Sequence, residues 1–173
     1  MIISAEITEQ PIAGQFDEII YEVSSPTTID WTWVKFEDEN YYEWYGQFRG
    51  LPKSIALSTK HNKVLILTSD YLIEIDCISK KMTSFESIYE EQKIYQDLTV
   101  TPDGDFIIAD YYSIELVGAL LDERQTIESP KPMDMIKFNG WIDNHLQISC
   151  LEFPTNIKIK LELDTNSMKI HEK

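Results

Sequence analysis

Residues 54–76, SIALSTKHNKVLILTSDYLIEID, decide the fold class predicted for this chain. They contain three short apolar runs, and turn-forming residues of the types Asn, Asp and Ser separate these runs. Runs of this length that are rich in Ile, Leu and Val and end at such residues are typical of β-strands. The segment therefore predicts three consecutive antiparallel strands joined by tight turns.

The same order of strands and turns returns twice farther along the chain. A second copy, DLTVTPDGDFIIADYYSIELV, starts at Asp97, and a third, MIKFNGWIDNHLQISC, starts at Met135. The three copies start 43 and 38 residues apart. A period of about 40 residues with four short strands in each copy is the pattern of propeller blades.

Two of these segments, residues 54–76 and VTPDGDFIIADYYSIELV at 100–117, resemble the blade cores of WD-repeat-like and related β-propellers. The resemblance covers residues 54–171, although the Gly-His and Trp-Asp pairs of true WD repeats are absent. It implies a fold, and it carries no catalytic residues.

The first part of the chain contains four more strand-like runs and therefore predicts a fourth sheet. A closed ring usually needs at least four blades, and the repeats alone offer three, so either the ring closes small with the N-terminal sheet or it stays open. We expect an all-β fold in which antiparallel sheets form an open, half-propeller-like stack. A β-sandwich is the alternative. We expect one domain, 1–173, divided into an N-terminal sheet and three blade-like repeats: 1–53, 54–96, 97–134 and 135–173.

Helix signals are few in this chain. The only helical turn that the sequence predicts lies around Ser87–Gln96. We also expect the four tryptophans to fill the middle of the stack: Trp31, Trp33, Trp44 and Trp141.

The charge of the chain is strongly unbalanced. Thirty Asp and Glu residues face 15 Lys and Arg residues, which gives a formal net charge of -15. Such a field repels nucleic acids and anionic membranes and speeds the encounter with basic partners. Solubility alone is the alternative explanation of the acidity.

The sequence also predicts a cytoplasmic protein. The start, MIISAEITEQ, has no basic region followed by an apolar one, and no apolar run reaches the length of a membrane span. Cys77 and Cys150 each stand at the end of an apolar run, so we expect them to be free thiols that are at least half-buried.

No motif indicates catalysis. The patterns GxSxG, GxGxxG and GxxxxGK are absent, and His61, His145 and His171 are scattered. A metal site needs clustered ligands. We therefore expect no enzyme, no cofactor and no metal, although a triad assembled from distant residues stays an alternative.

Acidic and aromatic residues stand together in FEDENYYEWYGQFRG, residues 36–50. Strand alternation divides this stretch: EDEN becomes a turn, while Tyr42, Trp44 and Phe48 become core residues. The other side chains of this hairpin then face outward, and the same pairing of Asp with Tyr returns in two later turns. Aromatic anchors beside carboxylates suit a basic protein partner. The predicted partner-binding residues are Asp38, Glu39, Tyr41, Glu43, Tyr45, Asp70, Tyr71, Asp110, Tyr111 and Tyr112.

In size, acidity and lack of catalytic and export motifs, the chain resembles the immunity proteins of bacterial polymorphic and contact-dependent toxin systems. The resemblance implies a non-enzymatic protein that binds and occludes the active site of a basic cognate toxin, commonly a nuclease. Two alternatives stay open at this point. One is a propeller-like scaffold or sensor domain in a larger assembly, and the other is a small hydrolase or lyase.

Overall fold

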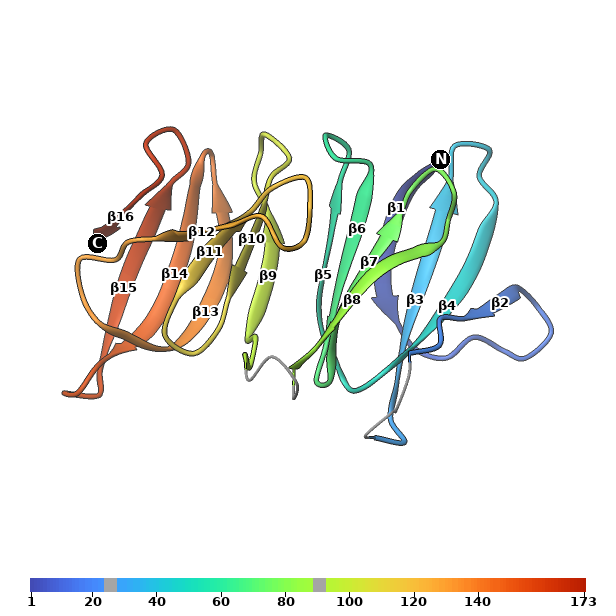
Figure 1. The fold of residues 1–173 in the computed structure, drawn as a ribbon, viewed down its shortest axis with the longest axis horizontal. Coiled ribbons are helices and arrows are strands. Elements are labelled where there is room, and N and C mark those ends of the chain that lie inside the picture. The colour runs from blue at the N-terminus through green and yellow to red at the C-terminus, as the bar shows by residue number, and fades with distance from the viewer. Residues whose placement is uncertain (24–27, 89–92) are drawn as a thin grey trace. The chain divides into compact units, whose positions relative to one another are not determined.

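The computed structural model describes residues 1–23, 28–88 and 93–173. The chain forms two compact units, Met1–Gln92 and Lys93–Lys173. The described residues are built from strands, which form four separate four-stranded sheets, two in each unit (Figure 1). This is the all-β, open propeller-like fold class predicted from the repeated segments. No helix of the described residues is long and apolar enough to cross a membrane.

The first sheet has the strand order β1-β3-β4-β2. Its strands β1, β3 and β4 are antiparallel, whereas β2 lies at the edge and runs parallel to β4, with Asp17 opposite Trp44. The long connections on both sides of β2 make this parallel pairing possible, because a tight hairpin turn would force an antiparallel one. The strands are β1 (Ile2–Thr8), β2 (Asp17–Ile20), β3 (Trp31–Asp38) and β4 (Glu43–Arg49).

The second sheet completes the first unit and follows the chain in simple order. Each of its strands pairs antiparallel with the next one through a short turn, as the sequence pattern predicts. The strands are β5 (Pro52–Ser58), β6 (Lys63–Thr68), β7 (Tyr71–Asp76) and β8 (Met82–Ser87).

Aromatic rings from the first sheet pack between the two sheets of the first unit. The rings of Tyr21 and Phe48 stack at 4.8 Å between centroids, and those of Phe36 and Trp44 stack at 5.3 Å. Val34 and the β6 and β7 residues Val64, Ile66, Ile73 and Ile75 close the same core. Gly46 lies beneath the rings, where a Cβ atom would stand 2.7 Å from Phe48 and 2.8 Å from Phe36, so only glycine leaves room for them.

The second unit contains two antiparallel meanders with the same strand order as the second sheet. Their apolar faces meet in a core of Ile and Leu side chains that includes Ile107, Ile114, Leu146, Leu161 and Leu163. The strands are β9 (Asp97–Val100), β10 (Phe106–Ala109), β11 (Ile114–Val117), β12 (Arg124–Ile127), β13 (Met133–Ile142), β14 (His145–Glu152), β15 (Ile157–Asp164) and β16 (Lys169–Glu172).

Strand β12 is the one strand that the sequence pattern did not predict. Its four residues, RQTI, stand in a polar stretch and pair only with β11 at the edge of their sheet. An edge strand of this length carries little apolar signal. The predicted helical turn around Ser87–Gln96 includes residues 89–92, which lie outside the described residues.

The tryptophans do not share one place, so the prediction that all four fill a common middle is wrong. Trp44 is buried in the core of the first unit, and Trp141 packs against the core of the second unit with its Nε1 3.0 Å from Thr99 Oγ1. Trp31 and Trp33 are half-buried on the opposite face of β3, because alternate strand residues point to opposite faces.

Both cysteines are free and buried, as predicted. Burial raises the pKa of the Cys77 thiol to about 11, and it also raises the pKa of Cys150. Both side chains are therefore protonated near neutral pH and behave as small apolar groups.

Candidate functional site

Asp38 organises the turn between β3 and β4, which is the centre of the predicted partner-binding surface. Its Oδ1 accepts hydrogen bonds from the backbone nitrogens of Asn40, at 2.9 Å, and Tyr42, at 3.2 Å. Its backbone carbonyl accepts a further bond from the nitrogen of Tyr41 at 2.8 Å. A short side chain that bonds the backbone two to four residues ahead fixes the shape of a turn. The acid therefore holds the turn in one conformation.

The other oxygen of Asp38 binds Lys80, which belongs to the turn after β7 in the neighbouring sheet. Lys80 Nζ lies 2.6 Å from Asp38 Oδ2 and 4.4 Å from the centroid of the Trp44 ring. The hydrogen bond from Lys80, supported by the backbone bonds of the turn, lowers the pKa of Asp38 from its usual 3.8 to about 2. Asp38 thus ties the turns of two sheets together.

The lowered pKa of Asp38 predicts a specific dependence of stability on pH. Because the folded chain favours the charged carboxylate, Asp38 stabilises the fold above about pH 4, and this contribution is lost as the pH falls towards 2. Asp38→Asn keeps the acceptor for the turn but removes the charge. We expect the stability difference between wild type and this variant, measured by thermal unfolding, to fall at about pH 2.5 to roughly a third of its value at pH 6. A difference that stays constant over this range would contradict the role of the ion pair.

Asp38 is therefore not an exposed surface acid, and its predicted place on the partner-binding surface is corrected. Only 5 % of its surface is exposed, since both carboxylate oxygens face internal partners. Glu39 and Tyr41 do stand at the tip of the turn, where the Glu39 side chain is 57 % exposed and Tyr41 is 81 % exposed. The tip thus presents one acid and one tyrosine to solvent.

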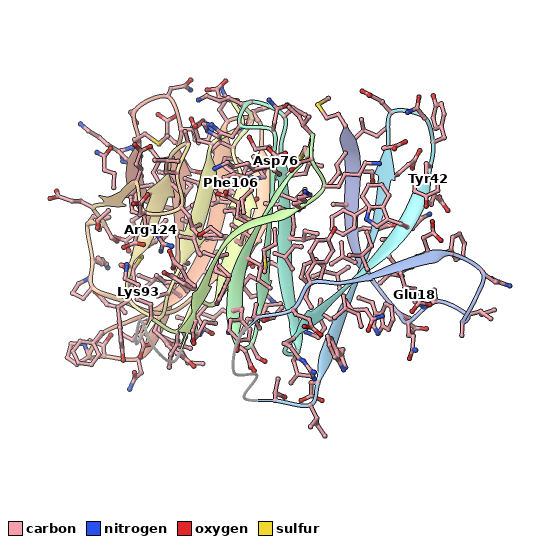
Figure 2. The ribbon with its side chains drawn as sticks, turned by 45° about the vertical axis from the view of Figure 1, so that its right-hand side comes forward. Glu18, Tyr42, Asp76, Lys93, Phe106 and Arg124 are labelled. Atoms are coloured by element: carbon pink, nitrogen blue, oxygen red, sulfur yellow. The ribbon has the colours of Figure 1, made fainter. Side chains whose placement is uncertain are left out.

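Tyr42 was predicted to lie in the core, and this prediction is wrong. It is 47 % exposed, its ring stacks over Trp44, and its hydroxyl donates a hydrogen bond to Asp17 at the start of β2 (Figure 2). The reason is that β4 begins at Glu43, so Tyr42 still belongs to the turn. Trp44 and Phe48, within the strand, are buried as predicted.

The outer face of the first sheet, opposite its core, combines aromatic rings with paired charges. Glu43 lies on this face, as predicted, and its carboxylate is 2.6 Å from Lys35 Nζ. This hydrogen bond raises the pKa of Lys35. At the other end of the same face, the Arg49 guanidinium lies 3.7 Å from the centroid of the Trp31 ring. The face is acidic towards the β3–β4 turn and aromatic towards the far end of β3.

Tyr45 also points to this outer face, but only 9 % of it is exposed. The ring of Phe16 covers it at 5.0 Å between centroids, because the chain passes over this face before it enters β2. Tyr45 is therefore a packing residue, and its predicted place on an accessible partner-binding surface is corrected.

Asp70 lies in the turn between β6 and β7, Tyr71 is the first residue of β7, and each is only 2 % exposed. Tyr71 belongs to the core of the first unit, while Asp70 Oδ1 accepts a hydrogen bond from Ser69 Oγ at 2.6 Å. Both side chains are therefore buried and not exposed as a partner-binding surface would require, while partner contact itself stays a prediction. At this position Asp70 stabilises the turn and Tyr71 packs in the core.

The equivalent turn between β10 and β11 contains Asp110, Tyr111 and Tyr112. Asp110 again holds its turn, since its Oδ1 accepts bonds from the nitrogens of Tyr112, at 2.7 Å, and Ser113, at 2.6 Å. Tyr111 is half-buried and Tyr112 is 66 % exposed. These three residues belong to the second unit, whereas the β3–β4 turn belongs to the first.

A basic hollow lies on the last sheet, away from every predicted site residue. In IKIKLEL, residues 157–163, charged and apolar residues alternate, so Lys158 and Lys160 share one strand face. In the structure, these lysines and Lys173 line a hollow of about 350 Å³. The sequence feature that indicates this hollow is the group of lysines near the end of an otherwise acidic chain.

No protein-family model matches the chain, and no curated protein is similar to it. Solved structures with a partial likeness include the dihydro-heme d1 dehydrogenase NirN in complex with DHE, at 11 % identity and a TM-score of 0.47. That match covers 82 % of this chain and 43 % of the other. Virginiamycin B lyase from Staphylococcus aureus matches at 14 % identity and a TM-score of 0.49, over 86 % of this chain and 53 % of the other. The chain spans about half the length of these structures, and at such identities and scores no family or activity follows from them.

Proposed function

We propose that this chain is a non-enzymatic protein-binding module whose partner is a basic protein, and that the tip of the β3–β4 turn is the point of contact. The contact residues in this proposal are Glu39, Tyr41 and Glu43. The observation that carries it is the conformation of Tyr41, a large and exposed side chain at a rigid position with positive φ.

Tyr41 has a φ of 60°, in the left-handed region of the backbone. Glycine and asparagine occupy this region readily, while other residues adopt it at a cost of about 1–2 kcal/mol. Among the described residues, Asn62, Asp143 and Asn156 also have positive φ, as do Lys80, Met135 and Met168. Tyr41 is the one aromatic residue in this group. A tyrosine there contributes little packing, since it is 81 % exposed. Strain that the fold itself does not need is characteristic of functional positions.

The surroundings of Tyr41 suit a basic partner. Residues 1–92 contain 16 Asp and Glu residues against 7 Lys and Arg residues, so the unit that carries the turn is acidic as a whole. Glu39 and Glu43 flank the tyrosine, and the hydrogen bonds of Asp38 keep the turn in one shape before any partner arrives. A preordered aromatic residue between carboxylates serves as an anchor that basic side chains surround.

Among proteins of this kind, an immunity protein fits the combination best. In this proposal the acidic tip enters the substrate-binding cleft of a basic toxin domain, and Glu39 and Glu43 pair with the cationic side chains that would otherwise hold the substrate. Such binding is sensitive to ionic strength, because Glu39 is exposed and Glu43 is half-exposed. The protein then acts by occupying the cleft and needs no chemistry of its own.

Replacing Tyr41 by asparagine tests the proposal, because we expect stability and binding to change in opposite directions. Tyr41→Asn relieves the left-handed strain and should raise the free energy of unfolding by about 1 kcal/mol. The same change removes the anchor and should weaken binding of the basic domain encoded by the neighbouring gene roughly tenfold or more. Equilibrium unfolding and isothermal titration of the two purified proteins measure these effects. A raised stability with unchanged binding would refute the assigned contact.

Tyr112→Asn is the matched control for this experiment. It removes another exposed tyrosine, but in the second unit, and we expect binding to stay within about twofold of wild type. If Tyr112→Asn weakens binding and Tyr41→Asn does not, the contact lies at the β10–β11 turn. If the neighbouring gene product does not bind at all, the proposal of an immunity protein is lost.

The repeated four-stranded sheets favour a second candidate, a propeller-like scaffold or sensor domain. Repeat architectures of this kind offer several surfaces and serve as binding platforms. A scaffold should hold two partners at once, whereas an immunity protein forms a one-to-one complex. The mass of the complex, measured by light scattering, separates these two functions.

A further inference from the structure

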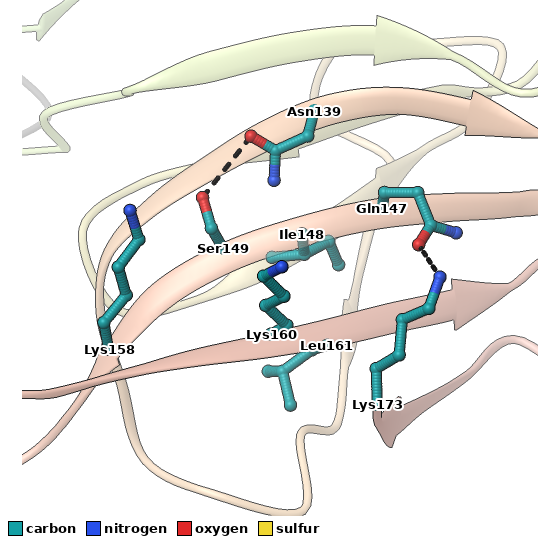
Figure 3. A pocket seen from close by; sticks show the side chains of 8 residues that line it. All are labelled: Asn139, Gln147, Ile148, Ser149, Lys158, Lys160, Leu161 and Lys173. Atoms are coloured by element: carbon teal, nitrogen blue, oxygen red, sulfur yellow. Dashed lines mark hydrogen bonds between the residues drawn. The ribbon is translucent and has the colours of Figure 1, made fainter.

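A hollow of about 350 Å³ opens on the outer face of the last sheet, in the second unit (Figure 3). Strands β13, β14 and β15 contribute to it, together with Lys173 directly after β16. Its volume lies in the range of small-molecule sites in proteins. The residues that line it are Asn139, Gln147, Ile148, Ser149, Lys158, Lys160, Leu161 and Lys173.

The strand register brings these lysines together. Ser149 on β14 stands opposite Lys137 on one side and Lys160 on the other, and the backbone nitrogen of Lys173 bonds the carbonyl of Lys160 at 3.1 Å. Lys158 precedes Lys160 by two residues, so both side chains leave the same face of β15, roughly 7 Å apart. Several ammonium groups therefore share a short stretch of one sheet face.

The groups that remain available in the hollow are hydrogen-bond donors. Lys173 donates to Gln147 Oε1 at 2.5 Å, and Ser149 Oγ donates to Asn139 Oδ1 at 3.4 Å. Both amide oxygens thus already have partners within the hollow, as the dashed lines in Figure 3 show. The ammonium groups of Lys158 and Lys160 and the amide nitrogen of Asn139 are left to bind a ligand. A cavity that offers donors and positive charge suits an anion.

Lys158 and Lys160 also differ from many other lysines of this acidic chain. Among the described residues, the lysines within 4 Å of a carboxylate include Lys35, Lys63, Lys80, Lys93, Lys131 and Lys173. No carboxylate lies within that distance of Lys158 or Lys160 in the described part of the chain, although the whole molecule has twice as many acids as bases. The nearest acid on this face, Glu162, is 3.7 Å from Lys173. The two free lysines therefore keep their charge available for a ligand.

We propose that this hollow binds a small anion with two or more phosphate groups. Two phosphate groups match the pair of ammonium groups on β15, and the amide nitrogen of Asn139 binds from β13. The overall charge of -15 repels anions, so only a local site makes such a ligand bind. This site lies in the second unit and is independent of the function proposed for the β3–β4 turn.

Titration of the full chain with tripolyphosphate tests the proposal. We expect one bound anion per chain, and we expect orthophosphate and sulfate to bind roughly tenfold more weakly because each has a single anionic group. The double variant Lys158→Gln/Lys160→Gln should weaken tripolyphosphate binding roughly tenfold or more. The double variant Lys158→Arg/Lys160→Arg keeps both charges and donors and should retain binding within about threefold.

A control variant that loses two lysines elsewhere distinguishes specific binding in the hollow from general electrostatic attraction of the anion to the protein. Lys60→Gln/Lys81→Gln removes two exposed lysines of the first unit and should leave the affinity within about twofold of wild type. The proposal is overturned if tripolyphosphate does not bind at millimolar concentration, or if both glutamine pairs weaken it equally. Equal affinity for orthophosphate would overturn the requirement for two phosphate groups. Circular dichroism of each variant confirms that the compared proteins are folded.

Discussion

Phe48→Ala should lower the free energy of unfolding by about 3–5 kcal/mol, which is the range for removing a fully buried aromatic ring. Phe48 is completely inaccessible to solvent, stacks on Tyr21 and meets the edge of Phe36 at 6.3 Å between centroids. Gly46 packs against the same rings so closely that nothing on β4 can refill the space. The cavity that Phe48→Ala leaves therefore stays open. Chemical denaturation of the whole chain then measures the full loss of unfolding free energy.

Phe85→Ala is the matched control for this core position. Phe85 lies on β8, is 37 % exposed and contacts Tyr71 edge to face at 6.0 Å. The same change of residue type at this half-open place should cost about 1 kcal/mol or less. If the two variants lose equal stability, the aromatic cluster between the sheets of the first unit is not the main source of that unit's stability.

Glu115→Ala should lower the free energy of unfolding by about 2–4 kcal/mol, because it leaves two cations without their shared carboxylate. Arg124 lies 3.1 Å from Glu115 Oε2, and Lys93 lies 3.1 Å from Glu115 Oε1. Arg124 is almost buried; it also donates to the hydroxyl of Tyr95 and, at 2.8 Å, to the carbonyl of Leu121. Figure 2 marks Lys93 and Arg124 in the second unit. Once Glu115 is gone, the guanidinium keeps its burial and loses the carboxylate that lies 3.1 Å from it.

Glu172→Ala provides the corresponding control on the surface of the same unit. Glu172 is 53 % exposed, and its partner Lys131, 3.0 Å away, keeps a second carboxylate in Glu152. Loss of such an exposed pair should cost less than about 1 kcal/mol. If Glu115→Ala proves as mild as Glu172→Ala in equilibrium unfolding, water reaches the Arg124 guanidinium and the pair does not hold the second unit together.

The fold class could be predicted because the repeated pattern is local. Each segment from β5 onward alternates short apolar runs with Asn, Asp or Ser, and neighbouring runs pair through the turns between them. Strand β12 escaped prediction because an edge strand needs no apolar face. The pairing of β2 with β4 could not be predicted either. The two strands are far apart in the sequence, and a local sequence pattern does not show which distant strands pair.

The candidate site was predictable only in part, because exposure depends on what the rest of the fold places nearby. Alternation along β4 correctly put Glu43 outside and Trp44 inside. It could not reveal that Lys80 reaches Asp38 from another sheet, or that Phe16 covers Tyr45. The repeated Asp and Tyr pairs at positions 70 and 110 looked like a surface theme, and the structure gives both aspartates a role in their turns.

The strand order of the first sheet also determines when that sheet can form. Ile2 pairs with Asp38, and Asp17 pairs with Trp44, so β1 and β2 have no partners in their own sheet until the ribosome has released β3 and β4. In each later sheet, every strand pairs with the next strand in the sequence, so only short loops separate the pairing partners. Folding slows as contacts join residues farther apart in sequence. The first sheet is therefore completed only after residue 49 has been synthesised, and until then its apolar residues stay exposed.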